Sequence, residues 1–246
     1  MQATDANYKE LFDSGDYIAE AKVVIDGITY QQDKLYNMSV HRKMFKENKP
    51  MIGCAVSGEI ELSVDDPGRV FSRQAKIVPY YRLKNKTKVS GWIQKGTYYI
   101  DTRDIDEETG RIDIHGYDAL RLAERAYPSS TLTWSATSPT AFDVMKEIMT
   151  FLTGATDVNS RTSNYIEQET IDKINSTRHI IGFPAQYTMR EVLESIAAIY
   201  GGNFIMSDNG KLKLVSFVGA YEETFYLITE TGRRITFGGT RILLRG

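Results

Sequence analysis

The side chains best suited to catalysis or metal binding in this sequence are three histidines and one cysteine, and they are scattered. His41, His115 and His179 stand singly in strand-like segments, without the spacing of HExxH or another metal-ligand motif. Cys54 lies among small apolar residues in MIGCAVSG, which favours a buried hydrophobic side chain over a nucleophile. A single cysteine also excludes an internal disulfide framework and a thiolate metal cluster.

Carboxylates gather between Asp101 and Glu108, where they could suggest a calcium site. An EF-hand loop starting at Asp104 would place Thr109 where glycine is required and His115 where a bidentate Glu is required. A solvated hairpin tip explains these acids better. The pair Asp65-Asp66 precedes Pro-Gly and is typical of a turn, whereas glycosidase carboxylates must flank a cleft.

A basic segment without acids could contact phosphate; its members are Arg82, Lys84, Lys86, Lys88 and Lys95. The spacing also suits a loop or a solvent-facing edge strand, where lysines block unwanted strand pairing. We favour this second interpretation and expect segment 82–95 to face outward or a protein neighbour. The net charge of −2 gives no general reason to expect nucleic-acid binding.

No phosphate-cradling loop is present in the sequence, since Gly201-Gly202 follows a predicted helix and such a loop precedes one. From the residues alone we therefore assign no catalytic, cofactor-binding or metal-binding residue and expect no cofactor. We expect a protein that is not an enzyme and that acts through shape and contact.

The first part of the chain, 17–116, has the period-two alternation of β-strands. AKVVIDGITY ends a strand at Asp26-Gly27, a strong two-residue hairpin signal. GEIELSV alternates cleanly, and LYNMSVHRKMF predicts a long strand with one face running from Tyr36 to Met44. A further hairpin is predicted around Glu108-Thr109-Gly110. About half a dozen strands in roughly 100 residues is the density of a small barrel or sandwich.

After Gly116 the apolar period becomes helical. Asp118 can cap a short helix, and SPTAFDVMKEIMTFL predicts a longer one with Ser138 as cap, Pro139 at its first position and Gly154 just past its end. The stretch 155–174 is polar and less periodic, and it predicts a loop with at most one short helix or strand.

A compact unit is predicted over 187–217, in YTMREVLESIAAIYGGNFIMSDNGKLKLVSF. Thr188 and Glu191 form a capping box, an apolar stripe follows at helical spacing, and Gly201-Gly202 ends the helix. Asp208-Asn209-Gly210 then supplies a tight turn between two strands. A helix with one apolar face must lie on something, and this hairpin is the nearest candidate.

No apolar run approaches the roughly 18–20 residues that cross a bilayer. The first residues, MQATDANYKELFDSGDY, are polar and acidic, without the apolar core of a secretion signal. We therefore expect the chain to be made and folded in a cytoplasm.

Several of these segments, in this order, resemble the N-terminal part of phage and prophage tail hub proteins. They are IGCAVSGEIELSV (52–64), VPYYRL (78–83), GTYYIDT (96–102), TGRIDIHGYDALRLAERAY (109–127) and the unit 187–217. The family comprises tail-tip or tail-associated proteins of siphophages, similar in design to the baseplate hubs of contractile phages. The resemblance covers most of the chain. It rests on the order of these segments and on their pattern of residue types rather than on an invariant signature.

The resemblance implies an α+β, β-dominated fold: a tail-tube-like β-barrel or sandwich plus a helix-and-hairpin insertion. It divides the chain into a tube-like domain (1–116), a helix-bearing hub domain (117–217) and a strand-like segment (218–246) of a second tube-like domain. Only 29 residues follow Phe217, fewer than such a domain needs, so the second domain is expected to be incomplete or completed by other segments.

The resemblance also implies a function: a homotrimeric ring that joins the hexameric tail tube or distal tail protein to the tip and closes or guides the DNA channel. Tape-measure and downstream tip proteins are further implied partners, phage DNA would pass without specific binding, and the location would be the virion, after assembly in the host cytoplasm. Two other functions stay open from the residues: a tail-associated cell-wall hydrolase or peptidase, and a glycan-binding adhesion module whose tyrosines would stack on sugars.

Overall fold

We describe the fold from a computed structural model of the whole chain. Between residues 4 and 217 it describes all but 47–48, 66–67, 69, 73, 129–138, 155–164, 178, 180, 182–183 and 185. Beyond 217 it describes 225–226, 236–237, 240–241 and 243–244.

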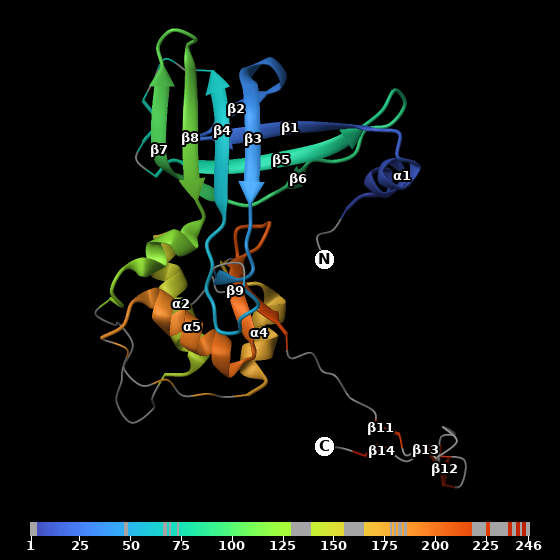
Figure 1. Cartoon of the computed structure of the whole chain (residues 1–246), viewed down its shortest axis with the longest axis vertical. Helices are drawn as coiled ribbons and strands as arrows, with labels where there is room; N and C mark the ends of the chain where they lie inside the picture. The colour runs from blue at the N-terminus through green and yellow to red at the C-terminus, as the bar shows by residue number, and fades with distance from the viewer. Residues whose placement is uncertain are drawn as a thin grey trace.

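An eight-stranded antiparallel sheet forms the first part of the chain (Figure 1). Its strands are β1 (Ile18–Ile25), β2 (Ile28–Gln31), β3 (Leu35–His41), β4 (Glu59–Asp65), β5 (Lys76–Lys84), β6 (Ile93–Gln94), β7 (Tyr98–Asp106) and β8 (Arg111–Tyr117), with a 3-10 turn, η1 (Gln32–Lys34), after β2. The strand order is β2-β1-β5-β7-β8-β4-β3, with β6 beside β5. The large sheet together with the helices described below confirms the predicted α+β, β-dominated class. The ladder ends at β2 and β3, so the sheet is not closed into a barrel.

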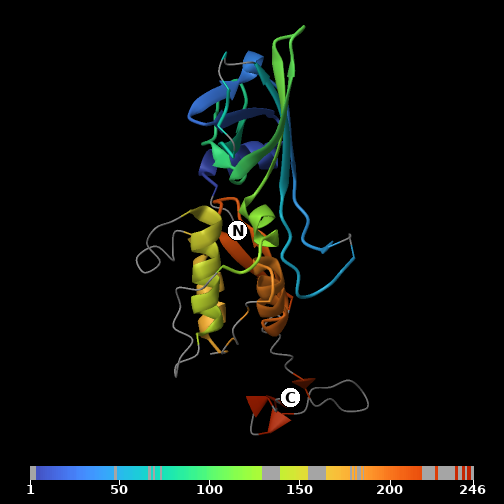
Figure 2. The ribbon, with the colours of Figure 1, turned by 90° about the vertical axis from the view of Figure 1, so that its left-hand side faces the viewer.

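The sheet bends so that its two halves face each other. In Figures 1 and 2, β3, β4, β7 and β8 run lengthwise along the molecule, and β1 and β5 cross behind them. One buried cluster lies between the halves, and it includes Val23, Ile25 and Ile77 from one half and Ile60, Leu62, Val64, Ile112 and Ile114 from the other. The predicted alternation of β4 is confirmed, because its apolar residues point into this core and Glu61 is exposed.

Both predicted hairpins in this sheet are confirmed. Asp26 and Gly27 have φ angles of 49° and 82°, the positive values that a tight two-residue turn needs, and Ile25 pairs with Ile28 across them. The second hairpin joins β7 to β8, with Asp106 opposite Arg111 and Gly110 at positive φ near the tip.

The predicted long strand is shorter than its pattern suggested. β3 ends at His41, and Arg42 and Met44 lie outside it. The chain leaves the sheet there and runs along the second part of the molecule before returning to β4 (Figure 1). Tertiary hydrogen bonds from Asn203 to this connection, described below, replace strand pairing.

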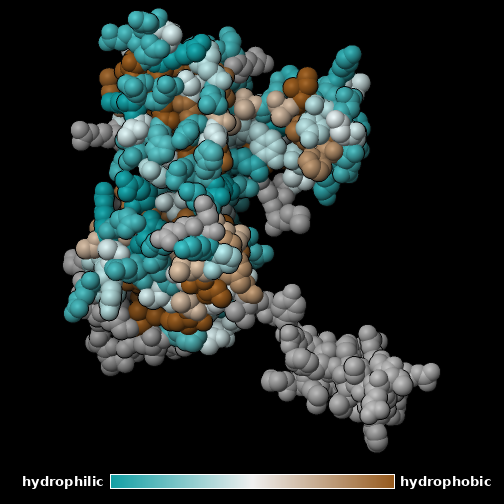
Figure 3. Space-filling model, in the orientation of Figure 1, coloured by the Kyte–Doolittle hydropathy of each residue, from teal (hydrophilic) through white to brown (hydrophobic). Residues whose placement is uncertain are grey.

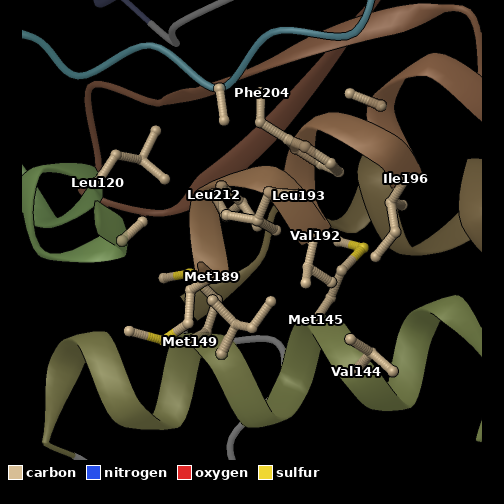
Figure 4. Close-up of a cluster of buried hydrophobic side chains, with 14 of the residues drawn as sticks. Leu120, Val144, Met145, Met149, Met189, Val192, Leu193, Ile196, Phe204 and Leu212 are labelled. Atoms are coloured by element: carbon tan, nitrogen blue, oxygen red, sulfur yellow. The ribbon is translucent and has the colours of Figure 1, made fainter. Parts of the chain in front are cut away.

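In the described residues of the second part, three α-helices and a 3-10 helix pack around a β-hairpin. These elements are η3 (Ala119–Glu124), α2 (Ala141–Thr153), α4 (Gln168–Asn175), α5 (Met189–Ile199), β9 (Gly202–Met206) and β10 (Leu212–Ser216). Their apolar faces form one buried cluster (Figure 4) that includes Met145, Leu193, Ile196 and Phe204. The predicted packing of α5 on the hairpin is confirmed, since both contribute to this cluster.

Helix ends agree with the sequence at some positions and not at others. The Thr188–Glu191 capping box of α5 is present, and Gly154 ends α2 at a φ of 68°. The predicted start of α2 is wrong: Thr140 caps the helix through a capping box with Asp143, so Pro139 precedes it. Ser138 lies outside the described residues. Asp118 caps η3 as predicted.

The stretch 155–174 was predicted to be mostly loop. Its described portion contains the start of α4, whose Thr170 and Ile174 are buried against the rest of the helical part. Residues 155–164 lie outside the described residues.

Gly202 permits the closest strand approach in the second part. A Cβ atom there would lie 2.4 Å from the carbonyl oxygen of Val215 on the paired strand, so backbone would have to move. We expect Gly202→Ala to destabilise the protein by about 2–4 kcal/mol. Urea unfolding measures this change. Ser63→Ala, on β4, is the control because it adds no atom against backbone, and equal midpoints for the two variants would contradict the prediction.

A short helix, α1 (Ala6–Ser14), forms an arm beside the far end of β5 (Figure 1). Leu11 is its buried residue, and the Tyr8 and Tyr81 hydroxyls lie 2.8 Å apart. The sequence pattern did not predict this helix, because most of its residues are polar and Leu11 is its one buried residue.

The predicted strand-like segment 218–246 lies largely outside the described residues. Four two-residue strands are described there: β11 (Phe225–Tyr226) pairs with β14 (Leu243–Leu244), and β12 (Thr236–Phe237) pairs with β13 (Thr240–Arg241). No helix in the described part of the chain is long and apolar enough to span a membrane.

Candidate functional site

The three histidines stay apart in the structure. His41 Nε2 lies 2.8 Å from Ser39 Oγ, and His115 Nε2 lies 3.9 Å from a Glu59 carboxylate oxygen. His179 meets the Tyr200 ring edge-on, with centroids 5.1 Å apart. Over the residues that the structure describes, no three His, Cys, Asp or Glu side chains gather as a metal site requires.

Cys54 lies in the interior of the protein, and Asp106 of the acidic run is bonded within a hairpin turn. Cys54 is buried, as its apolar neighbours predicted. Asp106 accepts hydrogen bonds from the Thr109 hydroxyl and from the Glu108 and Thr109 amides, which builds the predicted hairpin tip. The hydrogen bond from the Thr109 hydroxyl is the main reason that the pKa of Asp106 lies below its ordinary value.

The basic segment 82–95 is paired with acids from elsewhere in the chain. Glu20 binds both Arg82 and Lys84, Lys88 pairs with Glu10 of α1, and Lys95 lies 3.6 Å from Asp208. The hydrogen bond from Lys84 is the main cause that lowers the pKa of Glu20. Along Arg82 and Lys84, β5 pairs with β1 on one side, while its pairing with β7 is confined to Lys76 and Ile77. The loop or edge-strand interpretation of this segment therefore stays a prediction.

The most tightly built polar site joins the two parts of the molecule, and we call it the polar joint: Gly58, Asp118, Arg190 and Asn203 with the connection 42–57. Asp118 follows β8, and its side chain is 5% exposed. Its two carboxylate oxygens accept hydrogen bonds from the amides of Gly58, at 2.6 Å, and Leu120, at 3.0 Å. Burial raises the pKa of Asp118 to about 7, although both amides and the nearby Arg42 and Arg190 favour its charged form.

Asn203 holds the connection between β3 and β4 against the hairpin. This fully buried side chain accepts a hydrogen bond from the Cys54 amide at 2.9 Å. It donates hydrogen bonds to the carbonyls of Met44, at 2.9 Å, and Met51, at 2.8 Å. Backbone bonds between the connection and β9 continue alongside, from Phe204 to Cys54 at 2.7 Å and from Val56 to Phe204 at 3.0 Å. The connection thus adds a short third strand to the hairpin, through a parallel bridge of Ala55 with Phe204.

Arg190 and Arg42 add further hydrogen bonds and ion pairs to the joint. Arg190, on α5, donates to the carbonyls of Ala55 and Leu120, and its Nε lies 2.6 Å from Glu124. Arg42 pairs with Asp208 in the β9–β10 turn and donates to the Tyr98 hydroxyl at 3.2 Å. These contacts tie the connection 42–57, β7, η3, α5 and the hairpin together.

Open depressions lie on the surface of these parts. One, of about 440 Å³, borders the joint between the connection and the start of α5 and is lined by residues of both charges, including Lys43, Glu59 and Glu194. Another, of about 480 Å³, lies on the outer face of β3, β4, β7 and β8. In the first, the Thr188 hydroxyl donates a hydrogen bond to Glu191, and this pair is the capping box that begins α5.

The outer faces of the two sheet halves differ in charge. We call the outer face of β3, β4, β7 and β8 the acidic face; it carries Glu59, Glu61, Asp65, Asp104, Asp106 and Asp113, with Arg111 opposite both Asp65 and Asp106. We call the outer face of β1, β5 and β6 the basic face; it carries Lys22, Lys76, Tyr80, Arg82, Lys84 and Trp92, and also Glu20, which pairs with Arg82 and Lys84. Hydrophilic residues cover much of the sheet part visible in Figure 3.

Sequence reasoning missed most of the polar joint. Asp118 was recognised only as a helix cap, which it is, but the cap motif does not reveal the Gly58 amide. Nothing in the pattern of NFIMS marks Asn203 as buried, because its partners lie about 150 residues away in the sequence.

Comparison with known proteins gives structural likenesses and no sequence match. No protein-family model matches the chain, and no curated protein matches it. The 43 kDa tail protein of prophage MuSo2 from Shewanella oneidensis has a TM-score of 0.43 at 16% identity, over 86% of this chain and 59% of its own.

Two further solved structures are similar to the same extent. The tail protein from Neisseria meningitidis MC58 has a TM-score of 0.45 at 11% identity, over 85% of this chain and 53% of its own. Prophage tail protein gp18 from Listeria monocytogenes EGD-e has a TM-score of 0.43 at 13% identity, over 86% of this chain and 55% of its own. The chain thus spans somewhat over half the length of these proteins. At such scores and identities the likeness by itself establishes no shared function.

Proposed function

We propose that this chain is a structural protein of a phage or prophage tail, and more specifically a hub. Three copies would form a ring that joins the tail tube or distal tail protein to the tip and closes or guides the DNA channel. Under this proposal residues 1–116 are the tube-like domain, 117–217 the helix-bearing domain and 218–246 part of a second tube-like domain. The sequence resemblance to tail hub proteins is the starting point.

The observation that carries the proposal is the open-ended sheet. Its ladder stops at β2 and β3. Near those ends Ile18 on β1 is 65% exposed and Tyr36 on β3 is 45% exposed. Strand edges and apolar side chains of this kind are liabilities on a single molecule and become interfaces in a ring.

The polar joint supports the same role. A hub must transmit force between the tube above and the tip below, so its two parts must keep a set orientation. Buried hydrogen bonds of Asp118, Arg190 and Asn203 link the sheet to the helical part in this way. Satisfied buried polar networks specify a single arrangement more strictly than apolar contacts do.

Assembly with the tail-tube or distal tail protein of the same phage tests the proposal. We expect light scattering after size-exclusion chromatography to give a complex of three copies with a hexameric partner, and negative-stain images to show a ring. A chain that stays monomeric and never binds the hexamer would contradict it. A zymogram on cell walls, with clearing abolished by one carboxylate substitution, would favour the hydrolase instead.

A further inference from the structure

The two outer sheet faces point away from each other because their inner faces share one core. A surface that carries one charge on one side and the opposite charge on the other is complementary to a second copy of itself. Such a contact is heterologous, and heterologous contacts form rings when the rotation between copies closes.

Trp92 lies at the centre of the basic face. The Lys22 Nζ lies 4.6 Å and the Arg82 guanidinium carbon 4.3 Å from its ring, and Lys22 also lies 5.0 Å from the Tyr80 ring. Trp, Tyr and Arg are the residue types that contribute most to protein–protein binding. Stacking against the cations holds the Trp92 ring in place, so little side-chain entropy is lost when a partner covers it.

Two acids of the acidic face lie opposite each other on paired strands. Asp104 on β7 lies directly opposite Asp113 on β8, and like charges at directly opposed positions destabilise a strand pair. Both residues line the depression of about 480 Å³, together with Glu61. A cationic surface seated there would relieve the repulsion, and the basic face supplies one.

We propose that the basic face of one copy, centred on Trp92, docks on the acidic face of the next copy and forms the repeated contact of the ring. This inference rests on the proposed function for the number of copies. The pairing of the two faces follows from their charge and direction alone.

Two charge-reversal variants test the contact. Lys22→Glu with Lys76→Glu makes the basic face acidic and leaves the Arg82–Lys84–Glu20 cluster intact. Glu61→Lys with Asp104→Lys and Asp113→Lys reverses all three acids that line the depression and makes the acidic face basic. Each variant alone then presents like charges on both faces. We expect its self-association, measured by sedimentation equilibrium at low salt, to be weaker than that of the wild type by about tenfold or more.

Mixing the two variants restores opposite charges and should recover association of one with the other. Circular dichroism on heating checks that both remain folded. Wild-type protein that does not self-associate, variants that associate as well as wild type, or a mixture no better than its components would each overturn the inference. Binding of a DNA duplex to the basic face in place of a second copy would do so as well.

Capture by the tail-tube or distal tail protein is measured on the same variants. If the variants still bind that hexamer and self-associate as well as the wild type, the face pairing fails and the proposed function stands. If the wild type binds no hexamer but the two variants associate only when mixed, the face pairing stands and the tail function fails.

Discussion

Asn203→Leu should unfold this protein at a much lower urea concentration than the wild type, because three backbone groups lose their partner at once. The Cys54 amide and the carbonyls of Met44 and Met51 all bond to this one buried amide side chain. A buried polar group left unsatisfied costs about 1–3 kcal/mol, so we expect a loss of about 3–5 kcal/mol in the free energy of unfolding.

The matched control is Asn37→Leu, an identical substitution at an exposed position of β3. It should change the free energy of unfolding by about 0.5 kcal/mol or less. Asn203→Asp keeps the acceptor for Cys54 but places a buried carboxylate against the two carbonyls, so it should also be strongly destabilising. If the two leucine variants unfold alike, the connection 42–57 is not held by Asn203.

The second large effect concerns Asp118, whose loss leaves the Gly58 and Leu120 amides without an acceptor. We expect Asp118→Ala to lower the free energy of unfolding by about 2–4 kcal/mol at pH 8. Asp118→Asn retains one acceptor oxygen and should lose less. The comparison is made by urea unfolding, and equal losses for the two variants would contradict this account of the joint.

The same residue predicts a specific pH dependence. Its pKa is about 7 in the folded protein against 3.8 for an ordinary aspartate. Between these values the folded protein binds a proton that the unfolded chain has released, so this group makes the free energy of unfolding fall as pH rises. Its stabilising contribution is complete below pH 3.8 and has disappeared above about 7.

Asp118→Asn removes this titration and isolates its effect. The stability of the wild type relative to the Asn variant should fall by about 1.4 kcal/mol per pH unit between pH 5 and 6 and level off above about 7. Urea unfolding of both proteins at half-unit steps from pH 5 to 8 measures this difference. A constant difference over that range would show that the group does not titrate there.

Local elements of this fold were predictable from the sequence because their causes are local. The Asp26-Gly27 turn needs two positive φ angles, the Thr188–Glu191 box caps a helix within four residues, and β4 alternates because one face is buried. Each of these patterns has few structural solutions. The α+β class follows from their order.

Where two local signals competed, the sequence was less decisive. Thr140 and Ser138 are both suitable caps for α2, and the one with an acid three residues later caps the helix. Arg42 and Met44 continue the alternation of β3, but tertiary contacts draw the chain out of the sheet before them.

Sequence by itself therefore determined the strands, most helices and the scattering of His and Cys along the chain. Only the tertiary structure decided the open ladder, the polar joint and the two oppositely charged faces. The physical reason is distance along the chain: Asn203 meets Met51, and Asp118 meets Gly58, only after the parts between them have folded. Local propensity carries no information about such partners, whereas burial and hydrogen bonding across the joint select them.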